Sequence, residues 1–267
     1  MTQNTLTVLI LAILSLYGLL IGSFLNAWIW RLRNGHKVSR GRSMCPECKT
    51  QLKWYELFPV ISYIGLRGKC RTCHKRISPQ YPLVELTTAL SWSALFLIIN
   101  PNTPHALGEY IVWVIVTTLM IAAFVYDAKW MELPDEFTLP AIVVALVWLI
   151  VRWVGYGESA LAITQLINAM LFGGFFLLLW LGSRGAWLGD GDIRLAILMG
   201  LLLTPTQLVI AIFMSYLLGS IVGLSLIGLK LKTRKDAIAF GPFLIAGMYI
   251  GLIFGERLVN GYFRLLT

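Results

Sequence analysis

Apolar runs of about 17 to 25 residues recur along this chain of 267 residues, and they constrain its fold more than any other feature. A helix needs about 20 apolar residues to cross the hydrocarbon of a bilayer. Only 13% of the residues are charged, whereas a soluble domain of this size carries about 25%. We therefore expect an all-α polytopic membrane protein rather than a soluble domain with a large core.

The apolar runs predict about eight transmembrane helices. We expect them near residues 5–30, 83–99, 110–126, 138–154, 162–182, 193–203, 207–229 and 238–254. The sixth is short, because Thr204-Pro205-Thr206 forces a turn after it. No Lys or Arg precedes Arg31, so the first run is a membrane span and not a cleavable signal peptide. The predicted organisation is a first helix at 1–30, a soluble insert at 31–82 and a core of about seven helices at 83–267.

The basic residues predict the orientation of these helices. The insert 31–82 holds twelve Lys and Arg, and the loops on its side of the membrane bring the number to 19 of the 22 in the chain. Cytoplasmic loops carry the excess of Lys and Arg, so the insert is predicted to be cytoplasmic and both termini periplasmic. The net charge of +9 follows this topology, and the insert has no interleaved aromatic stacking set, so no nucleic-acid partner is expected.

All four cysteines lie in the insert, as two C-x-x-C pairs separated by 21 residues: Cys45, Cys48, Cys70 and Cys73. This spacing predicts a structural Zn²⁺ site with four thiolate ligands, which leaves no open position for catalysis. Disulfides are disfavoured on a reducing cytoplasmic face. The sequence from Cys70 to His74 also spells a c-type haem attachment signal, but that chemistry belongs on the outer face of the membrane. Metal ligation would supply the folding energy that so small an insert lacks.

Two aspartates are predicted to meet at the cytoplasmic membrane face. Asp127 ends the third span and Asp192 opens the sixth, and the two spans between them return the chain to the same side. Carboxylates at hydrogen-bonding distance share one proton, so one can act as a base on water and the other as an acid on a peptide group. Asp190, a third acid beside them, leaves open which carboxylates pair.

Structural roles and other functions compete with this interpretation. Asp192 can also be the N-cap of the sixth span, and for Asp135, which follows Pro134, we favour the N-cap role. An ion- or proton-coupled transporter would use the same carboxylates, but it would place them near the middle of the membrane. A zinc-ribbon scaffold without chemistry is a third reading. No H-E-x-x-H motif of a metalloprotease is present.

The combined motifs resemble the type IV prepilin leader peptidase/N-methyltransferase family, whose core is an aspartyl protease of the Gly-x-Gly-Asp type. The resemblance runs from the first span to the last and rests on the two C-x-x-C pairs and on these segments: Gly22-Ser23-Phe24-Leu25-Asn26, Arg67-Gly68-Lys69-Cys70, Tyr81-Pro82-Leu83-Val84-Glu85-Leu86, Leu133-Pro134-Asp135 and Gly189-Asp190-Gly191-Asp192. Two departures are Arg194, where the family often has Lys, and Asp190, where it usually has a small or aromatic residue.

The resemblance implies a function for each motif. Asp127 and Asp192 would be the catalytic pair of a bacterial inner-membrane enzyme that removes the basic leader of prepilin or pseudopilin precursors after a glycine. Such enzymes serve type IV pili and type II secretion. Members with the cysteine insert also methylate the new N-terminus with S-adenosylmethionine, and Gly68 and Lys69 occupy positions associated with that activity. Glu85 is either a proton acceptor for methyl transfer or a carboxylate that favours the start of its helix.

Overall fold

The computed structural model describes residues 3–38, 41–233 and 236–266 and contains two compact units, Met1–Ala122 and Ala123–Thr267. Among the described residues the regular structure is helical, and the β structure is limited to two isolated bridges. The predicted all-α fold is confirmed. Three basic residues that contribute to the predicted charge asymmetry lie outside the described residues, namely Arg40, Arg234 and Lys235.

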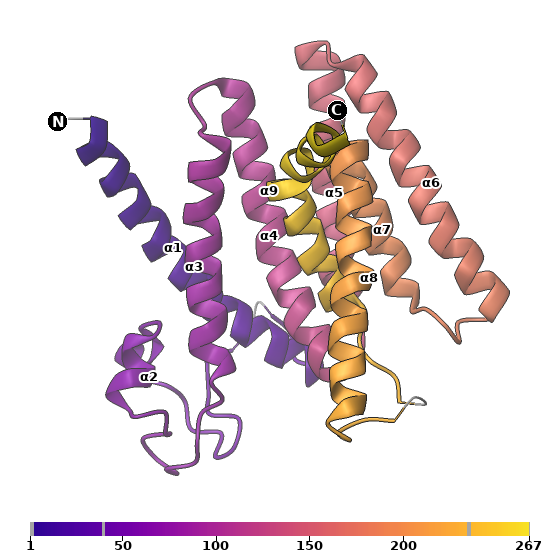
Figure 1. The fold of residues 1–267 in the computed structure, drawn as a ribbon. Helices are drawn as coiled ribbons and strands as arrows, with labels where there is room; N and C mark the ends of the chain where they lie inside the picture. Colours follow the sequence, from indigo (N-terminus) through magenta and orange to yellow (C-terminus); the bar gives the residue numbers. More distant parts are fainter. Residues whose placement is uncertain (1–2, 39–40, 234–235, 267) are drawn as a thin grey trace. The chain divides into compact units, whose positions relative to one another are not determined.

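The helices follow one another in the order shown in Figure 1. The first unit contains α1 (Gln3–Arg33), η1 (Trp54–Leu57), α2 (Ile61–Gly65), α3 (Gln80–Ile99) and most of α4 (Pro104–Trp130), which continues into the second unit. The second unit adds α5 (Asp135–Ile150), the π-helical turn η2 (Val151–Gly155), α6 (Ser159–Ser183), α7 (Asp190–Leu202), α8 (Pro205–Gly228) and α9 (Gly241–Leu266).

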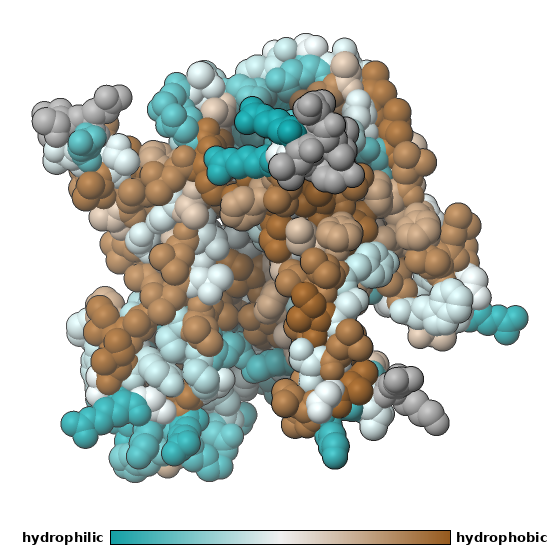
Figure 2. Space-filling view, viewed as in Figure 1, coloured by the Kyte–Doolittle hydropathy of each residue, from teal (hydrophilic) through white to brown (hydrophobic). Residues whose placement is uncertain are grey.

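Seven of the described helices are long and apolar enough to cross a membrane: α1, α3, α4, α5 with η2, α6, α8 and α9. Figure 2 shows their apolar side chains as brown surface, with hydrophilic side chains gathered toward helix ends and loops. The eighth expected span is α7, a helix of 13 residues. It rises only ~20 Å, less than the ~30 Å of hydrocarbon in a bilayer. The short sixth span predicted from the sequence is therefore a half-length helix.

Glycines bring α1 and α3 together in the first unit. Gly18 and Gly22 face α3 one turn apart, and a Cβ on either would lie 2.5 to 2.6 Å from the backbone of Ala89 or Glu85. Small residues at this spacing allow membrane helices to approach closely, so that van der Waals contact replaces the hydrophobic effect as the driving force. A hydrogen bond of 3.1 Å from Trp92 Nε1 to Thr118 Oγ1 then links α3 to α4.

Glycines also allow α8 and α9 to pack closely in the second unit. Gly247, Gly251 and Gly255 follow one another at intervals of four residues on α9, and each leaves no room for a Cβ against α8. Their neighbours on α8 are Gln207, Ala211 and Ser215, which also lie four residues apart. The two helices run side by side (Figure 1) because both present small or slender residues along one face.

The short helix α7 lies at the centre of the second unit, in contact with α5, α6, α8 and α9. The last carbonyl groups of a helix have no partners within that helix, and inside a bilayer they must find partners in the protein. Two side-chain amides of α6 provide them, since Gln165 donates to the carbonyl of Leu202 at 3.1 Å and Asn168 to that of Leu203 at 3.3 Å. Side chains of the neighbouring helix α6 thus cap the C-terminus of α7.

Candidate functional site

Asp127 lies in the last turn of α4, where its side chain is buried, with the residue only 4% exposed. A carboxylate at a helix C-terminus faces the negative end of the helix dipole, so this position does not stabilise its charge. The N-terminus of α9 compensates, because the backbone N–H of Gly241 donates to the Asp127 carboxylate. The Gly241 N–H therefore orients the Asp127 carboxylate, while the dipole of α4 does not favour its negative charge.

Asp192 is the third residue of α7 and is 6% exposed. Its Oδ2 accepts a hydrogen bond of 3.3 Å from the N–H of Gly189, which is the N-cap residue of the helix. Asp192 therefore contributes to capping from the third position, and the N-cap role considered for it from the sequence is wrong. The positive end of the α7 dipole favours its negative charge.

The structure brings Asp127 and Asp192 together within the second unit, although 64 residues separate them in the sequence. Their carboxylates are close enough for the charge of Asp127 to act on Asp192. Carboxylates in electrostatic contact can share one proton, which is the arrangement that acid–base catalysis by two acids requires. Three chain segments build this place: the end of α4, the start of α7 and the start of α9.

Glycines and one leucine fit closely around the two acids. A Cβ on Gly241 would lie 2.5 Å from Asp127 Oδ2 and 2.9 Å from Leu133 Cδ1. A Cβ on Gly191 would overlap the side chain of Leu133. The sequence analysis named Leu133 only as part of the Leu133-Pro134-Asp135 motif, and it did not identify Gly241. The Gly241-Pro242 pair at the start of the last span is the one sequence signal that marks this position.

The third acid, Asp190, turns outward from this pair. Its carboxylate forms an ion pair with Arg194 one turn further along α7, and Arg194 also pairs with Asp135 and approaches the carbonyl oxygen of Leu133 at 3.5 Å. The predicted N-cap role of Asp135 is wrong: Pro134 is the N-cap of α5, and Asp135 is its first helical residue. Its carboxylate is drawn to a guanidinium instead, which fastens the segment 131–134 to α7.

The four cysteines of the first unit converge on a single point. All four sulfur atoms lie within 4.8 Å of one another, and Cys45 Sγ is 3.9 Å from Cys73 Sγ. Tetrahedral ligands at 2.3 Å from Zn²⁺ would stand ~3.8 Å apart. The donor set and its spacing thus fit a tetrahedral thiolate site for a metal ion.

Both cysteine pairs adopt the same local backbone. Residues 44–51 and 69–76 each form a turn closed by an antiparallel bridge, Met44 with Gln51 and Lys69 with Arg76. Each turn has one left-handed residue, Lys49 in the first and His74 in the second. Hydrogen bonding to Thr50 lowers the pKa of Cys48 to about 6, which favours the thiolate form that binds metal ions.

Glu85, in the second turn of α3, holds the insert onto the membrane helices of the first unit. The residue is 6% exposed, and its Oε2 accepts a hydrogen bond of 2.7 Å from the N–H of Val60. Val60 has a φ of +59°, which a β-branched residue rarely adopts. The Ser23 hydroxyl on α1 also bonds to Glu85. This buried carboxylate therefore fixes a strained turn between η1 and α2.

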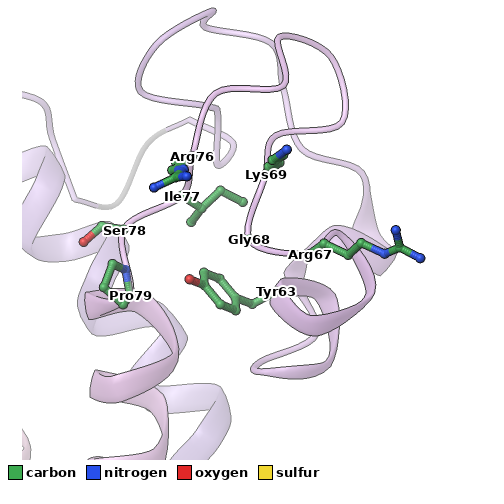
Figure 3. Close-up of a pocket in the computed structure, with 8 residues that line it drawn as sticks. All are labelled: Tyr63, Arg67, Gly68, Lys69, Arg76, Ile77, Ser78 and Pro79. Carbon is green, nitrogen blue, oxygen red and sulfur yellow. The ribbon is translucent and has the colours of Figure 1, made fainter.

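Gly68 and Lys69 line an open pocket of about 540 Å³ in the insert (Figure 3), within the size range of small-molecule sites. The other lining residues are Tyr63, Arg67, Arg76, Ile77, Ser78 and Pro79. Gly68 has a φ of +66°, and a Cβ there would lie 3.1 Å from the Tyr63 ring that faces the pocket. The glycine therefore keeps both the turn and the pocket open.

Comparisons with known proteins identify family matches in two parts of the chain. Residues 16–99 match the Bacterial Peptidase A24 N-terminal domain, and residues 113–224 match the Type IV leader peptidase family. No solved structure matches the chain.

Three curated relatives carry the name prepilin leader peptidase/N-methyltransferase. The protein of Aeromonas hydrophila is 31% identical over 92% of this chain and 91% of its own length. That of Pseudomonas aeruginosa is 28% identical over 93% and 92%, and that of Bacillus subtilis is 28% identical over 96% and 98%. With its multi-pass helical core, its buried acids and its cysteine insert, this chain belongs to the type IV leader peptidase family of inner-membrane enzymes.

Proposed function

We propose that this protein is an aspartyl endopeptidase that removes the leader from prepilin or pseudopilin precursors, with Asp127 and Asp192 as its catalytic pair. One observation carries the proposal: two buried carboxylates from different helices interact electrostatically at a place enclosed by Gly189, Gly241 and Leu133. The alternative of an ion-coupled transporter is not favoured, because the relatives that span nearly the whole chain are named as peptidases.

The two acids divide the chemistry of peptide hydrolysis. The ionised carboxylate takes a proton from water as the water attacks the peptide carbonyl, and the protonated one donates its proton to the carbonyl oxygen. As the C–N bond breaks, the first acid passes the proton from water to the leaving amine, and the second takes a proton back from the hydroxyl of the tetrahedral intermediate. The N–H groups of Gly241 and Gly189 orient one carboxylate each. The absence of a side chain on Gly189 leaves the backbone beside Asp192 open to an extended substrate, and the absence of one on Gly241 makes room for the Asp127 carboxylate.

The substrate follows from the position of the site. A precursor of this class has a short basic leader and an apolar helix, and cleavage after a glycine lies at the boundary between them. Asp127 at the end of α4 and Asp192 at the start of α7 lie at the cytoplasmic face in this proposal, and so they meet that boundary. Both termini of the enzyme then lie in the periplasm. The excess of Lys and Arg in the insert supports this orientation.

A second activity belongs to the first unit. We propose that the pocket at Gly68 and Lys69 receives S-adenosylmethionine, whose methyl group passes to the amine released by cleavage. The four cysteines hold Zn²⁺ and thereby keep the second cysteine turn, which carries Lys69, in place. Glu85 acts through Val60 as a positioning residue for this insert.

Cleavage of a synthetic precursor in proteoliposomes tests the catalytic pair. Asp127→Asn and Asp192→Asn each remove an ionisable oxygen, and both should abolish cleavage. Asp190→Asn is the matched control, because its carboxylate is exposed and paired with Arg194. Cleavage by either of the first two variants at the rate of the unmodified protein would refute the assignment.

Mass spectrometry of the product tests the methyl transfer separately. Supplying S-adenosylmethionine should add one methyl group to the new N-terminus. Gly68→Ala, which closes the pocket against Tyr63, should reduce methylation while cleavage continues. Equal methylation by Gly68→Ala and the unmodified protein would place the methyl donor elsewhere.

A further inference from the structure

The segment between the two cysteine pairs exposes an unusual amount of apolar surface for a polar insert. Residues 54–64, which include η1 and most of α2, form this apolar segment. Its exposed side chains are Trp54 (71% exposed), Ile61 (72%), Ile64 (67%), Phe58 (48%), Tyr55 (41%) and Leu57 (41%). Large contiguous apolar patches on soluble surfaces mark sites of association with another surface.

The hydrogen bond between Val60 and Glu85 fixes the level of this segment along the membrane normal. Glu85 lies five residues after Gln80, so it is ~7.5 Å along the axis of α3 from the start of that helix. The 20 residues of α3 span ~30 Å, which only just covers the hydrocarbon. The first turns of α3 must therefore lie at the membrane boundary, and Val60 is held beside them.

The lipid-facing surface of α3 extends the same apolar character. Leu83, Leu86 and Leu90 are exposed on this helix, as expected of side chains that contact lipid tails. The apolar segment 54–64 meets α3 at Glu85, between Leu83 and Leu86 in the sequence. A bilayer that covers these leucines therefore reaches the level of Trp54, Ile61 and Ile64.

The charges around the segment suit the polar layer of an anionic membrane. Lys53, Arg67 and Lys69 flank it with exposed positive side chains, and its single acid, Glu56, is paired with Arg71 at 3.1 Å. Basic residues at this level are attracted to anionic lipid headgroups, and Trp and Tyr favour the same layer.

We propose that the apolar segment 54–64 inserts into the headgroup layer of the bilayer beside α3, with the flanking cations on anionic phosphate groups. The insert is then seated on the membrane surface and does not project into water. This inference is independent of the catalytic assignment. The proposed partner of the apolar segment is the lipid surface. Binding of a second copy of the chain or of a precursor protein to the same side chains would contradict the proposal.

Site-directed photocrosslinking in nanodiscs tests the proposal on the whole protein. A benzophenone amino acid replaces Ile61 in one variant and Ile64 in another. Leu90, exposed on α3, is the lipid-facing reference, and Thr72, exposed on the second cysteine turn, is the reference for water. We expect the probes at Ile61 and Ile64 to form lipid adducts in a yield similar to that of the probe at Leu90. The probe at Thr72 should form almost no lipid adducts.

The composition of the adducts tests the role of charge. In nanodiscs that mix anionic and zwitterionic lipids, adducts at Ile61 should be enriched in the anionic lipid, and Lys53→Gln with Arg67→Gln should remove this enrichment. Adducts with a second copy or with an added precursor in place of lipid would overturn the proposal. So would lipid yields at Ile61 no higher than those at Thr72, or enrichment that survives the double substitution.

Discussion

The backbone of Gly241 holds the carboxylate of Asp127, and no side chain fits at Gly241 without displacing that carboxylate. The glycine opens α9, more than a hundred residues after the acid it contacts. The start of α9 is thereby part of the candidate active site.

Gly241→Ala should therefore impair cleavage strongly. The new methyl group would stand 2.5 Å from Asp127 Oδ2, so the carboxylate or the start of α9 must move. A displacement of ~1 Å at a catalytic group can reduce the rate ~100-fold. We expect a loss of that order in kcat/KM for precursor cleavage, with little change in Tm.

Gly228→Ala is the control for this prediction, because a Cβ there meets nothing within 4 Å. It should cleave as the unmodified protein does. Equal activity of Gly241→Ala and Gly228→Ala would show that the contact has no bearing on catalysis.

Arg194 should matter to activity more than to stability. Its partners Asp135 and Asp190 are largely exposed, and exposed ion pairs contribute only ~0–1 kcal/mol. Yet the guanidinium fastens the segment that carries Leu133, which packs on Gly191 beside Asp192. Arg194→Gln should lower kcat while Tm stays nearly constant, and Arg194→Lys should restore part of the rate.

Arg184→Gln serves as the comparison for Arg194→Gln, since Arg184 is exposed at the end of α6. Steady-state kinetics and thermal unfolding in the same detergent separate the two effects. A fall in Tm parallel to the fall in kcat would mean that Arg194 has a structural role only.

Two substitutions of Glu85 separate positioning from proton transfer. Glu85→Gln keeps an oxygen that can accept the Val60 N–H, whereas Glu85→Leu leaves that N–H without its partner. An unsatisfied buried donor costs ~1–3 kcal/mol. If Glu85 positions the insert, methylation persists in Glu85→Gln and is lost in Glu85→Leu. Loss in both variants would instead identify Glu85 as a proton acceptor, and quantitative mass spectrometry of the processed product distinguishes these cases.

Removing the metal should loosen the insert and leave the second unit folded. The four sulfurs within 4.8 Å of one another belong to the first unit, while Asp127 and Asp192 belong to the second. Treatment with a strong chelator should make the Lys and Arg residues of 41–76 accessible to trypsin, and added Zn²⁺ should restore protection.

Cys48→Ser should reproduce the effect of the chelator on tryptic cleavage, and Ser43→Ala, outside the thiolate set, should not. Full trypsin resistance of the chelated protein, with zinc loss verified by elemental analysis, would show that metal ligation does not organise this insert.

The sequence was sufficient for the helices but not for all of their ends. Apolar runs predicted each long helix, because the bilayer imposes a length that a window of residues can reveal. The sequence predicted Asp135 as an N-cap because Asp favours that position. In the structure its carboxylate forms an ion pair with Arg194 of α7 instead. The two short helices η1 and α2 were not predicted, since each has fewer than six residues and depends on contacts such as Val60 with Glu85.

The sequence predicted the two acids of the candidate site but not the role of the residues that surround them. Asp127 and Asp192 stand out because charged residues are rare in apolar sequence. Gly241 and Leu133 are not charged and have no such mark. Leu133 contacts Gly191 at the start of α7 and Gly241 at the start of α9, and no local pattern encodes these contacts. Likewise, the C-x-x-C spacing predicted the four-cysteine cluster, but the matching bridges around each pair appear only in three dimensions.

The cysteine cluster has one more consequence, for the chain that runs between Cys48 and Cys70. An ion bound by both turns would clamp the two ends of a 21-residue loop, and the apolar segment 54–64 occupies the middle of that loop. Metal affinity and contact with lipid would then be thermodynamically linked, so that each strengthens the other by the same factor. Loss of the metal ion would then weaken the contact of this segment with the membrane surface.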